Sequence, residues 1–127
     1  MPIFRRRRFP PTAASVRAAR AYTTAALRKG NAEAAAIDDV ALVVSELATN
    51  AVKHAGTAFD VAVQTDGQIR VDVTDESPRR VPIARRVGPT SITGRGLRIV
   101  EALCDRWGVD VRDGHKVVWC EIDRRHT

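Results

Sequence analysis

Apolar residues recur every three to four positions in three segments of the chain, a spacing that predicts amphipathic helices. The first segment is Thr12–Lys29, and the second runs from Glu33 or Asp38 to His54. The third opens at Gly94 and is expected to reach about Arg106. Glycines follow the first two segments at Gly30 and Gly56, as is typical where a helix ends.

Four other segments alternate apolar and polar residues with a period of two, which predicts β-strands. They begin near Phe59 and Ile69, and at Trp107–Val111 and Lys116–Ile122. Each pair of segments is separated by an Asp-Gly turn, so two hairpins are expected. Helices alternating with hairpins in this order predict an α+β fold, a two-layer α/β sandwich with a mostly antiparallel sheet covered on one face by about three helices.

Two segments do not follow this pattern. Residues 3–9 read as either a short edge strand or a disordered arm, which Pro10 and Pro11 end. We therefore divide the chain into a basic N-terminal arm or edge strand (1–10) and a single domain (11–127). Residues 76–93 hold three prolines and mostly turn-forming or basic residues, which predicts a long loop of the kind that often forms a lid.

The charge of the chain is unevenly distributed. Lys and Arg number 21 against 15 Asp and Glu, so the net charge is +6 and an anionic partner is expected. Residues 1–30 contain eight basic residues and no acid, whereas residues 31–78 contain nine acids and two basic residues. Residues 79–127 are basic again, with eleven basic and six acidic residues. Such segments indicate two surfaces with different roles rather than a general polyanion binder.

Several classes of protein are excluded by composition. No apolar stretch approaches the roughly 18 residues of a membrane helix, and the N-terminus lacks the apolar run of a secretory signal. Cys104 and Cys120 form neither a disulfide framework nor a zinc site. We interpret them as buried free thiols of a reducing cytosol, with a single bridge left open. A cytoplasmic protein without a membrane partner is the expectation.

The second predicted helix carries the first candidate site. Glu46 and Asn50 lie four residues apart and so share one helix face, which Lys53 and His54 continue one turn later. Asn is a poor residue for a helix interior, so Asn50 needs a reason to be there. A carboxylate, an amide and a lysine in a row can hold a hydrated Mg²⁺ and phosphates. The alternative is a solvated helix face, which for Glu46 alone is the better interpretation.

Two further candidates follow. Asp75 ends a predicted strand before the long loop, where it can accept hydrogen bonds from a ligand or simply start a turn. Gly94 and Gly96 open the third helix, where free N–H groups attract phosphate and Arg95 adds charge. The alternative for this pair is a flexible helix entry, because two glycines alone are weak evidence.

Taken together, these motifs resemble the GHKL ATPase pattern of gyrase, histidine kinases and MutL. The stretches that carry the resemblance are SELATNAVKHA, VDVTDESPRRVP, TGRGLRIVEALCDRWGV and KVVWCE. They are most similar to the small stand-alone histidine-kinase-like ATPases of actinobacteria, which are related to anti-sigma factor serine kinases. The resemblance covers about residues 10–122. It implies a sandwich of the GHKL (Bergerat) type with a mixed sheet, and ATP with Mg²⁺ as its ligands.

The resemblance also implies roles for individual residues. Glu46 corresponds to the catalytic glutamate that activates the attacking group, and Asn50 to the asparagine that holds Mg²⁺. Lys53 falls where histidine kinases often carry a phosphate-contacting lysine, and His54 flanks it. Asp75 corresponds to the aspartate that reads the adenine amino group. These assignments agree with the chemistry of the residues, a general base beside a metal clamp.

The two glycine boxes of the family are matched unequally. The second box, which caps the phosphates with backbone N–H groups, is matched by Gly94, Arg95, Gly96 and Leu97. In the stretch that corresponds to the first box, both later glycines of the family pattern are absent. The resemblance implies that Ser77, in the place of one of them, lies at the adenine end of the pocket. A threonine that often stands behind the adenine aspartate has no counterpart in residues 115–119.

Three functions follow from this comparison of motifs. The first is a Mg-ATP-binding regulatory protein, an anti-sigma factor-like serine/threonine kinase that binds a sigma factor and phosphorylates an anti-anti-sigma antagonist. The resemblance further implies a homodimer. The second is a nucleotide-binding switch without phosphotransfer, which the incomplete first glycine box favours. A basic nucleic-acid binder ranks last, because few aromatic residues are present to stack on bases.

Overall fold

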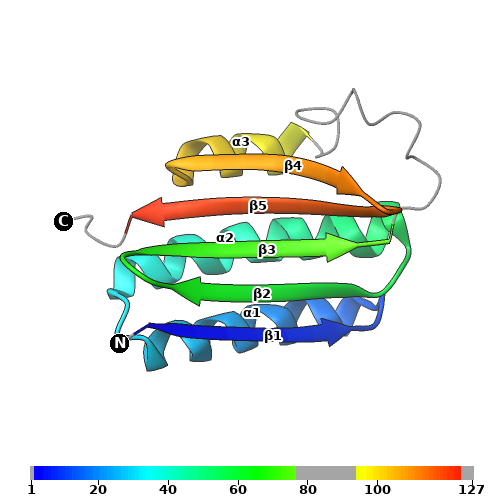
Figure 1. Ribbon diagram of the computed structural model, residues 1–127. Coiled ribbons are helices and arrows are strands. Elements are labelled where there is room, and N and C mark those ends of the chain that lie inside the picture. The colour runs from blue at the N-terminus through cyan, green and yellow to red at the C-terminus, as the bar shows by residue number, and fades with distance from the viewer. Residues whose placement is uncertain (1, 77–93, 124–127) are drawn as a thin grey trace.

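The computed structural model describes residues 2–76 and 94–123 (Figure 1). Its elements follow in the order β1 (Ile3–Phe9), α1 (Ala13–Lys29), α2 (Ala34–Asn50), η1 (Ala51–Ala55), β2 (Phe59–Thr65), β3 (Gln68–Asp75), α3 (Gly94–Leu103), β4 (Arg106–Arg112) and β5 (His115–Asp123). The five strands form one sheet in the order β1-β2-β3-β5-β4, and each described pairing is antiparallel. The helices cover one face, so the predicted two-layer sandwich is confirmed (Figure 1).

The core lies between the helices and the covered face of the sheet. Strand residues alternate in direction, so every second side chain of β2 and β3 faces the helices and is buried. Leu27 of α1 and Val40 and Leu47 of α2 meet this layer from the helix side. Phe59 stacks on Phe9 with ring centroids 5.5 Å apart, which extends the core to the edge strand. The predicted periods of 3.6 and 2 therefore describe the two layers of one core.

Residues 3–9 form the edge strand β1 rather than a disordered arm. This strand pairs with β2 along its whole length, from Ile3 opposite Thr65 to Phe9 opposite Phe59. Arg6 Nη2 lies 2.6 Å from the Asp60 carboxylate across the pair. The arginine run is compatible with a strand because every other arginine lies on the open face, where its charge remains hydrated.

Two helix ends differ from the expected boundaries. The second helix is α-helical only to Asn50 and continues to Ala55 as a wider π turn. The third helix ends at Leu103, so its expected end at Arg106 was wrong. The Asp105 N–H donates to the Glu121 carbonyl at 2.9 Å, and β4 begins at the next residue. The backbone at Asp105 and Arg106, which the helical spacing had assigned to the helix, therefore pairs with β5 instead.

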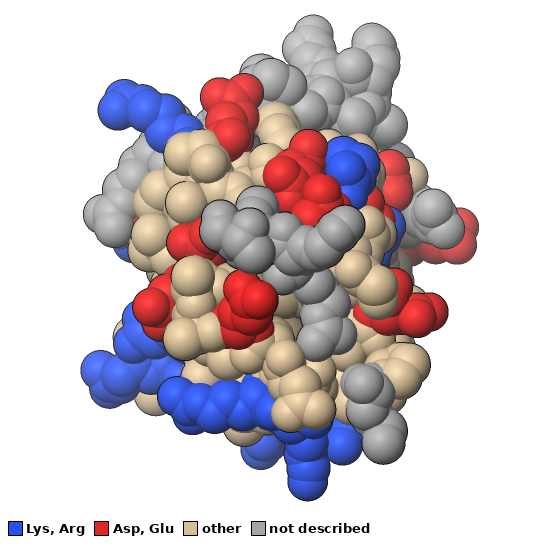
Figure 2. All heavy atoms as spheres, turned by 90° about the vertical axis from the view of Figure 1, so that its left-hand side faces the viewer, with Lys and Arg blue, Asp and Glu red and all other residues tan. Residues whose placement is uncertain are grey.

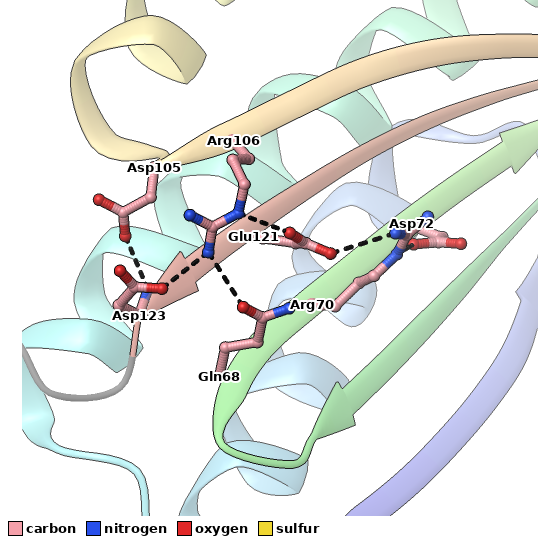
Figure 3. A network of polar contacts seen from close by, with 7 residues as sticks. All are labelled: Gln68, Arg70, Asp72, Asp105, Arg106, Glu121 and Asp123. Carbon is pink, nitrogen blue, oxygen red and sulfur yellow. Dashed lines mark hydrogen bonds and ion pairs between the residues drawn. The ribbon is translucent and has the colours of Figure 1, made fainter.

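Charged side chains on the open face of the sheet form a network (Figure 3). Arg106 lies 2.8 Å from both Glu121 and Asp123 and also donates to Gln68. Arg70 joins Glu121 from the next strand, and its guanidinium lies 4.6 Å from the centre of the Trp119 ring. The hydrogen bond from Arg106 lowers the pKa of Glu121, and a second one from Arg70 adds to the effect. The network thus links side chains of β3, β5 and β4 across the uncovered face.

Basic and acidic side chains occupy different levels of the molecule. Figure 2 shows the end that carries the β2–β3 turn, where most Lys and Arg spheres gather at the level of β1 and α1. Acidic spheres lie across the middle and upper levels of this view. Basic and acidic side chains thus lie at different levels of this face, whereas Arg6 and Arg8 of the basic segment form ion pairs with Asp60 and Glu76 of the acidic one. Among the described residues, no helix has the length and apolar character needed to cross a membrane.

The two cysteines are free thiols. Cys120 is buried in β5, whereas Cys104 is half-buried just beyond α3. The hydrogen bond with Cys104, together with burial, raises the pKa of the Cys120 thiol. The prediction of free thiols is thus confirmed, and only Cys104 is less buried than expected.

Candidate functional site

The candidate site residues gather at one end of the molecule. The C-terminal end of α2, the end of β3, the start of β5 and the start of α3 all lie at the right-hand end of Figure 1. Asn50, Asp75 and Gly94 stand at these element ends, although 44 positions separate the first from the last. The fold thus brings together three motifs that the sequence presents separately.

Asn50 is the most informative of these residues. Its side chain is only 7% exposed, and its amide nitrogen has no hydrogen-bond partner in the part of the chain that the structure describes. A buried polar atom without a partner is rare and calls for an explanation, of which a bound ligand, ion or water is one. Glu46 lies one turn earlier on α2 and is half-buried. A buried amide and a half-buried carboxylate on adjacent turns are a suitable pair for a phosphate and its metal ion.

The π turn η1 follows Asn50 directly. The Gly56 N–H donates to the Ala51 carbonyl, five residues earlier, at 2.9 Å, and Gly56 ends the turn with a φ of 67°. Turns of this type are frequent at functional sites. Lys53 and His54 lie in the turn and are exposed. Both residues lie at the same end of the helix as Asn50. Because the π turn is wider than an α-helical turn, they do not continue the helix face of Glu46 and Asn50 with α-helical spacing.

Asp75 is buried rather than part of a surface turn. It is the last residue of β3, faces the helices and is 3% exposed. Its carboxylate Oδ2 lies 3.6 Å from Lys116 Nζ on β5, the residue directly opposite in the register. The neighbouring backbone is fixed by the Glu76 N–H, which donates to Thr57 Oγ1 at 3.0 Å. The interpretation of Asp75 as a simple turn residue is therefore not supported.

Lys116 was not singled out by the sequence. It lies in the stretch in which the resemblance leads one to expect a threonine behind the adenine aspartate. Antiparallel pairing of β3 with β5 puts it beside Asp75. Counting back from Val118, which faces the core, would have indicated that Lys116 faces the helices too.

The second glycine box forms the start of α3. Gly94 is the first helical residue, and Gly96 is buried within the first turn. The N–H groups of a first turn lack helical partners, which suits them to bind an anion. Arg95 and Leu97 belong to the same turn, but their side chains lie outside the described part of the chain. Ser77 and the rest of the loop predicted over residues 76–93, apart from Glu76, also lie outside the described residues.

The described residues offer no site that could hold a metal ion by themselves. No three His, Cys, Asp or Glu side chains within 2–76 and 94–123 are placed to share one ion. Mg²⁺ commonly keeps several waters and is held by one or two protein ligands together with substrate phosphates. The buried amide of Asn50 fits this second arrangement, in which the ion arrives with a phosphate ligand.

A separate groove runs along the outer surface of α1 and α2. It has a volume of about 560 Å³. Its lining consists of arginines and small residues, namely Arg17, Ala18, Arg20, Ala21, Thr24, Arg28 and Ala41. Arg20 donates to Ser45 of α2 at 3.0 Å, which fixes one wall of the groove. Three arginines around an alanine floor suit an acidic surface with a small apolar element.

Comparison with known proteins agrees with the geometry. The model of the histidine kinase-like ATPase domain matches residues 9–122. The uncharacterized protein SCO4941 of Streptomyces coelicolor is 35% identical over 85 residues, which cover 61% of this chain and 79% of that protein. The crystal structure of the RsbU and RsbW domains of Rv1364c from Mycobacterium tuberculosis is similar in fold, with a TM-score of 0.70 and 21% identity. That match covers 94% of this chain and 32% of the other, so the chain spans about a third of that structure.

Proposed function

The chain belongs to the histidine kinase-like ATPase domain family, and on this premise we propose that it is a Mg-ATP-binding regulatory protein that phosphorylates a serine or threonine of a protein partner. The observation that carries the proposal is the buried amide of Asn50, whose nitrogen has no partner in the described chain. A phosphate oxygen of the nucleotide would accept a hydrogen bond from this nitrogen. The amide oxygen would then remain available to Mg²⁺.

The chain's own residues divide the work of phosphoryl transfer. Glu46, one turn from Asn50, accepts the proton of the attacking hydroxyl. The hydroxyl oxygen forms a bond to the γ-phosphorus, the bond from that phosphorus to the bridging oxygen breaks, and ADP leaves with the electron pair. Mg²⁺ would offset the charge of the phosphates during this step. The first turn of α3, opened by Gly94 and Gly96, would hold phosphate oxygens with its N–H groups.

Nucleotide binding is the first point to test. Titration of the protein with Mg-ATP in a calorimeter should give binding that Asn50→Ala weakens by about 10-fold or more, the loss expected for a hydrogen bond to a charged group. Gln64→Ala, an exposed amide on β2, is the matched control and should leave the affinity unchanged. Absence of binding to the folded wild-type protein at millimolar Mg-ATP would reject the proposal.

Phosphotransfer is tested separately. With labelled ATP and candidate antagonist proteins, Glu46→Gln should slow transfer by about 100- to 10,000-fold, because a general base contributes on this scale. The same variant should still bind Mg-ATP, since Gln preserves the shape of the side chain. Transfer that survives this substitution would remove Glu46 from the role of base.

We propose that the groove between α1 and α2 receives the protein partner. Its three arginines favour an acidic surface, as a sigma factor or an anti-anti-sigma antagonist of a cytoplasmic regulatory system would present. The double variant Arg17→Ala, Arg28→Ala should slow association with such a partner and reduce its salt dependence. We also propose that the protein is a homodimer, which a measurement of its molar mass by light scattering checks.

A nucleotide-dependent switch without transfer is the second candidate. It is favoured by the absence of both later glycines from the first glycine box, where Ser77 and Arg79 stand in their places. This candidate expects ATP binding that changes partner affinity while no phosphate appears on the partner. A nucleic-acid binder is less well supported, because Arg6 and Arg8 pair with Asp60 and Glu76, and Arg7 lies over the Phe9 and Tyr22 rings.

A further inference from the structure

The ion pair between Asp75 and Lys116 is the most buried ion pair in the described parts of the chain. The side chain of Asp75 is 5% exposed and that of Lys116 is 16% exposed. In each of the other described pairs at least one partner is about a third exposed or more. The pair also stands at the end of the molecule that carries Asn50 and the start of α3 (Figure 1). Its position and burial set it apart from the surface network.

Burial of this pair is a poor way to stabilise the fold. Removing two charges from water costs free energy that their attraction recovers only with excellent geometry. The separation of 3.6 Å between Lys116 Nζ and Asp75 Oδ2 is longer than a hydrogen bond, so these two atoms are not in the best geometry. A buried ion pair that adds little to stability can be retained for another role, such as binding a ligand at these element ends.

We propose that Lys116 determines nucleobase specificity together with Asp75, by donating a hydrogen bond to ring nitrogen N1 of adenine while Asp75 accepts one from the neighbouring amino group. This inference rests on the proposed ATP site. Register supports it, because Lys116 is directly opposite Asp75 and both side chains face the helices. An ammonium beside a carboxylate presents a donor and an acceptor at adjacent positions.

This arrangement matches adenine and opposes the other common purines. The edge of adenine has a donor at position 6 and an acceptor at position 1, so both contacts are satisfied. Hypoxanthine and guanine have an acceptor at position 6 and a donor at position 1. In the same orientation, the base oxygen would face the Asp75 carboxylate and the N1–H would face the Lys116 ammonium. A site that leaves buried polar groups unpaired rejects the wrong ligand strongly.

The sharpest test changes the ligand and leaves the protein intact. In 1-deaza-ATP a C–H group replaces N1, so the acceptor for Lys116 is lost while the amino group remains. Calorimetry on the wild-type protein should show binding about 10- to 100-fold weaker than that of ATP, the loss expected for one charged hydrogen bond. Equal affinities for the two nucleotides would overturn the inference without touching the proposed ATP site. If neither nucleotide binds, the proposed function fails and the inference fails with it.

A variant identifies Lys116 as the donor. Lys116→Met should weaken ATP binding by a similar factor and abolish the difference between ATP and 1-deaza-ATP. It should also reduce the preference for ATP over inosine triphosphate, because one of the two opposing contacts is removed. Lys116→Arg keeps a cation beside Asp75 and should retain discrimination, which provides a second, charge-preserving variant. Lys29→Met, an exposed lysine at the far end of α1, is the matched control. Discrimination that persists in a folded Lys116→Met protein would assign the contact to another residue.

Discussion

The open face of the sheet and the face covered by helices both carry ion pairs, but these differ in burial and in partners. On the open face, Arg106 and Arg70 share Glu121, and each contacts a further carboxylate from a half-exposed position (Figure 3). On the covered face, Asp75 and Lys116 form a buried pair at the element ends.

Burial and position distinguish ion pairs that only support the fold from an ion pair that serves a function. Exposed pairs contribute about 0–1 kcal/mol each and can be shared, extended or lost at little cost. A buried pair costs more free energy to desolvate, and this one stands where several element ends meet. A role in ligand recognition therefore explains it better than stability does.

The largest expected difference is between two phenylalanines. Phe59 is fully buried on β2, whereas Phe4 on β1 is 57% exposed on the open face. Phe59→Ala should lower the free energy of unfolding by about 3–5 kcal/mol, because it leaves a cavity in the core. Phe4→Ala should change it by about 0.5 kcal/mol or less. Urea denaturation of both variants measures the difference, and similar losses would contradict the division into covered and open faces.

The buried ion pair should show strong coupling. Lys116→Met should lower the free energy of unfolding by roughly 2–4 kcal/mol, slightly below the range for a fully buried pair, because it leaves the Asp75 carboxylate without its cation. The double variant Asp75→Asn, Lys116→Met should recover much of this loss, since no buried charge then remains. Thermal and urea unfolding of the single and double variants measure the coupling. A double variant no more stable than Lys116→Met would show that the pair is not electrostatically coupled.

One position on the open face should be more sensitive to substitution than Phe4. A Cβ added at Gly108 would lie 2.7 Å from the ring of Trp119 on the neighbouring strand, closer than real Cβ atoms approach other atoms. Gly108→Ala should therefore cost about 1–3 kcal/mol, the usual range for overpacking. In a Trp119→Ala background the same substitution should cost much less. Equal costs in both backgrounds, measured by urea unfolding, would exclude the ring as the cause.

The smallest effect concerns the pH dependence of the open-face network. Arg106 lowers the pKa of Glu121 in the folded state, so this carboxylate stabilises the fold above its unfolded pKa of about 4.3. The contribution is lost as the pH falls through the lower, folded pKa. The difference in unfolding free energy between wild type and Glu121→Gln should be no more than about 1 kcal/mol at neutral pH and should shrink toward about pH 3. A difference that grows at acid pH would contradict this assignment.

The elements of the fold were predictable to different degrees. Both hairpins and the body of each helix follow from local periodicity, since a residue's neighbours in sequence decide which face it occupies. The end of α3 was not predictable, because Asp105 pairs with Glu121, a partner 16 positions away. Neither was the choice between arm and strand for residues 3–9, which depends on pairing with β2 across 50 or more positions.

The candidate site shows the same division. Glu46 and Asn50 were recognisable because four-residue spacing on a helix is a local property. The wider turn after Asn50 was not, since a π turn leaves no mark in a pattern of apolar residues. Lys116 was overlooked for a different reason: alone it is an ordinary lysine of a strand, and only its neighbour gives it a role.

Sequence alone determined the helical and alternating segments, the distribution of charge and the motifs that identify the family, because each depends on residues close together in the chain. Tertiary structure decided which distant residues meet. Strand register set Lys116 beside Asp75, and the packing of α2 buried the amide of Asn50 without a partner in the described chain. Both depend on contacts across tens of residues, and such contacts form only when the core has brought the elements together.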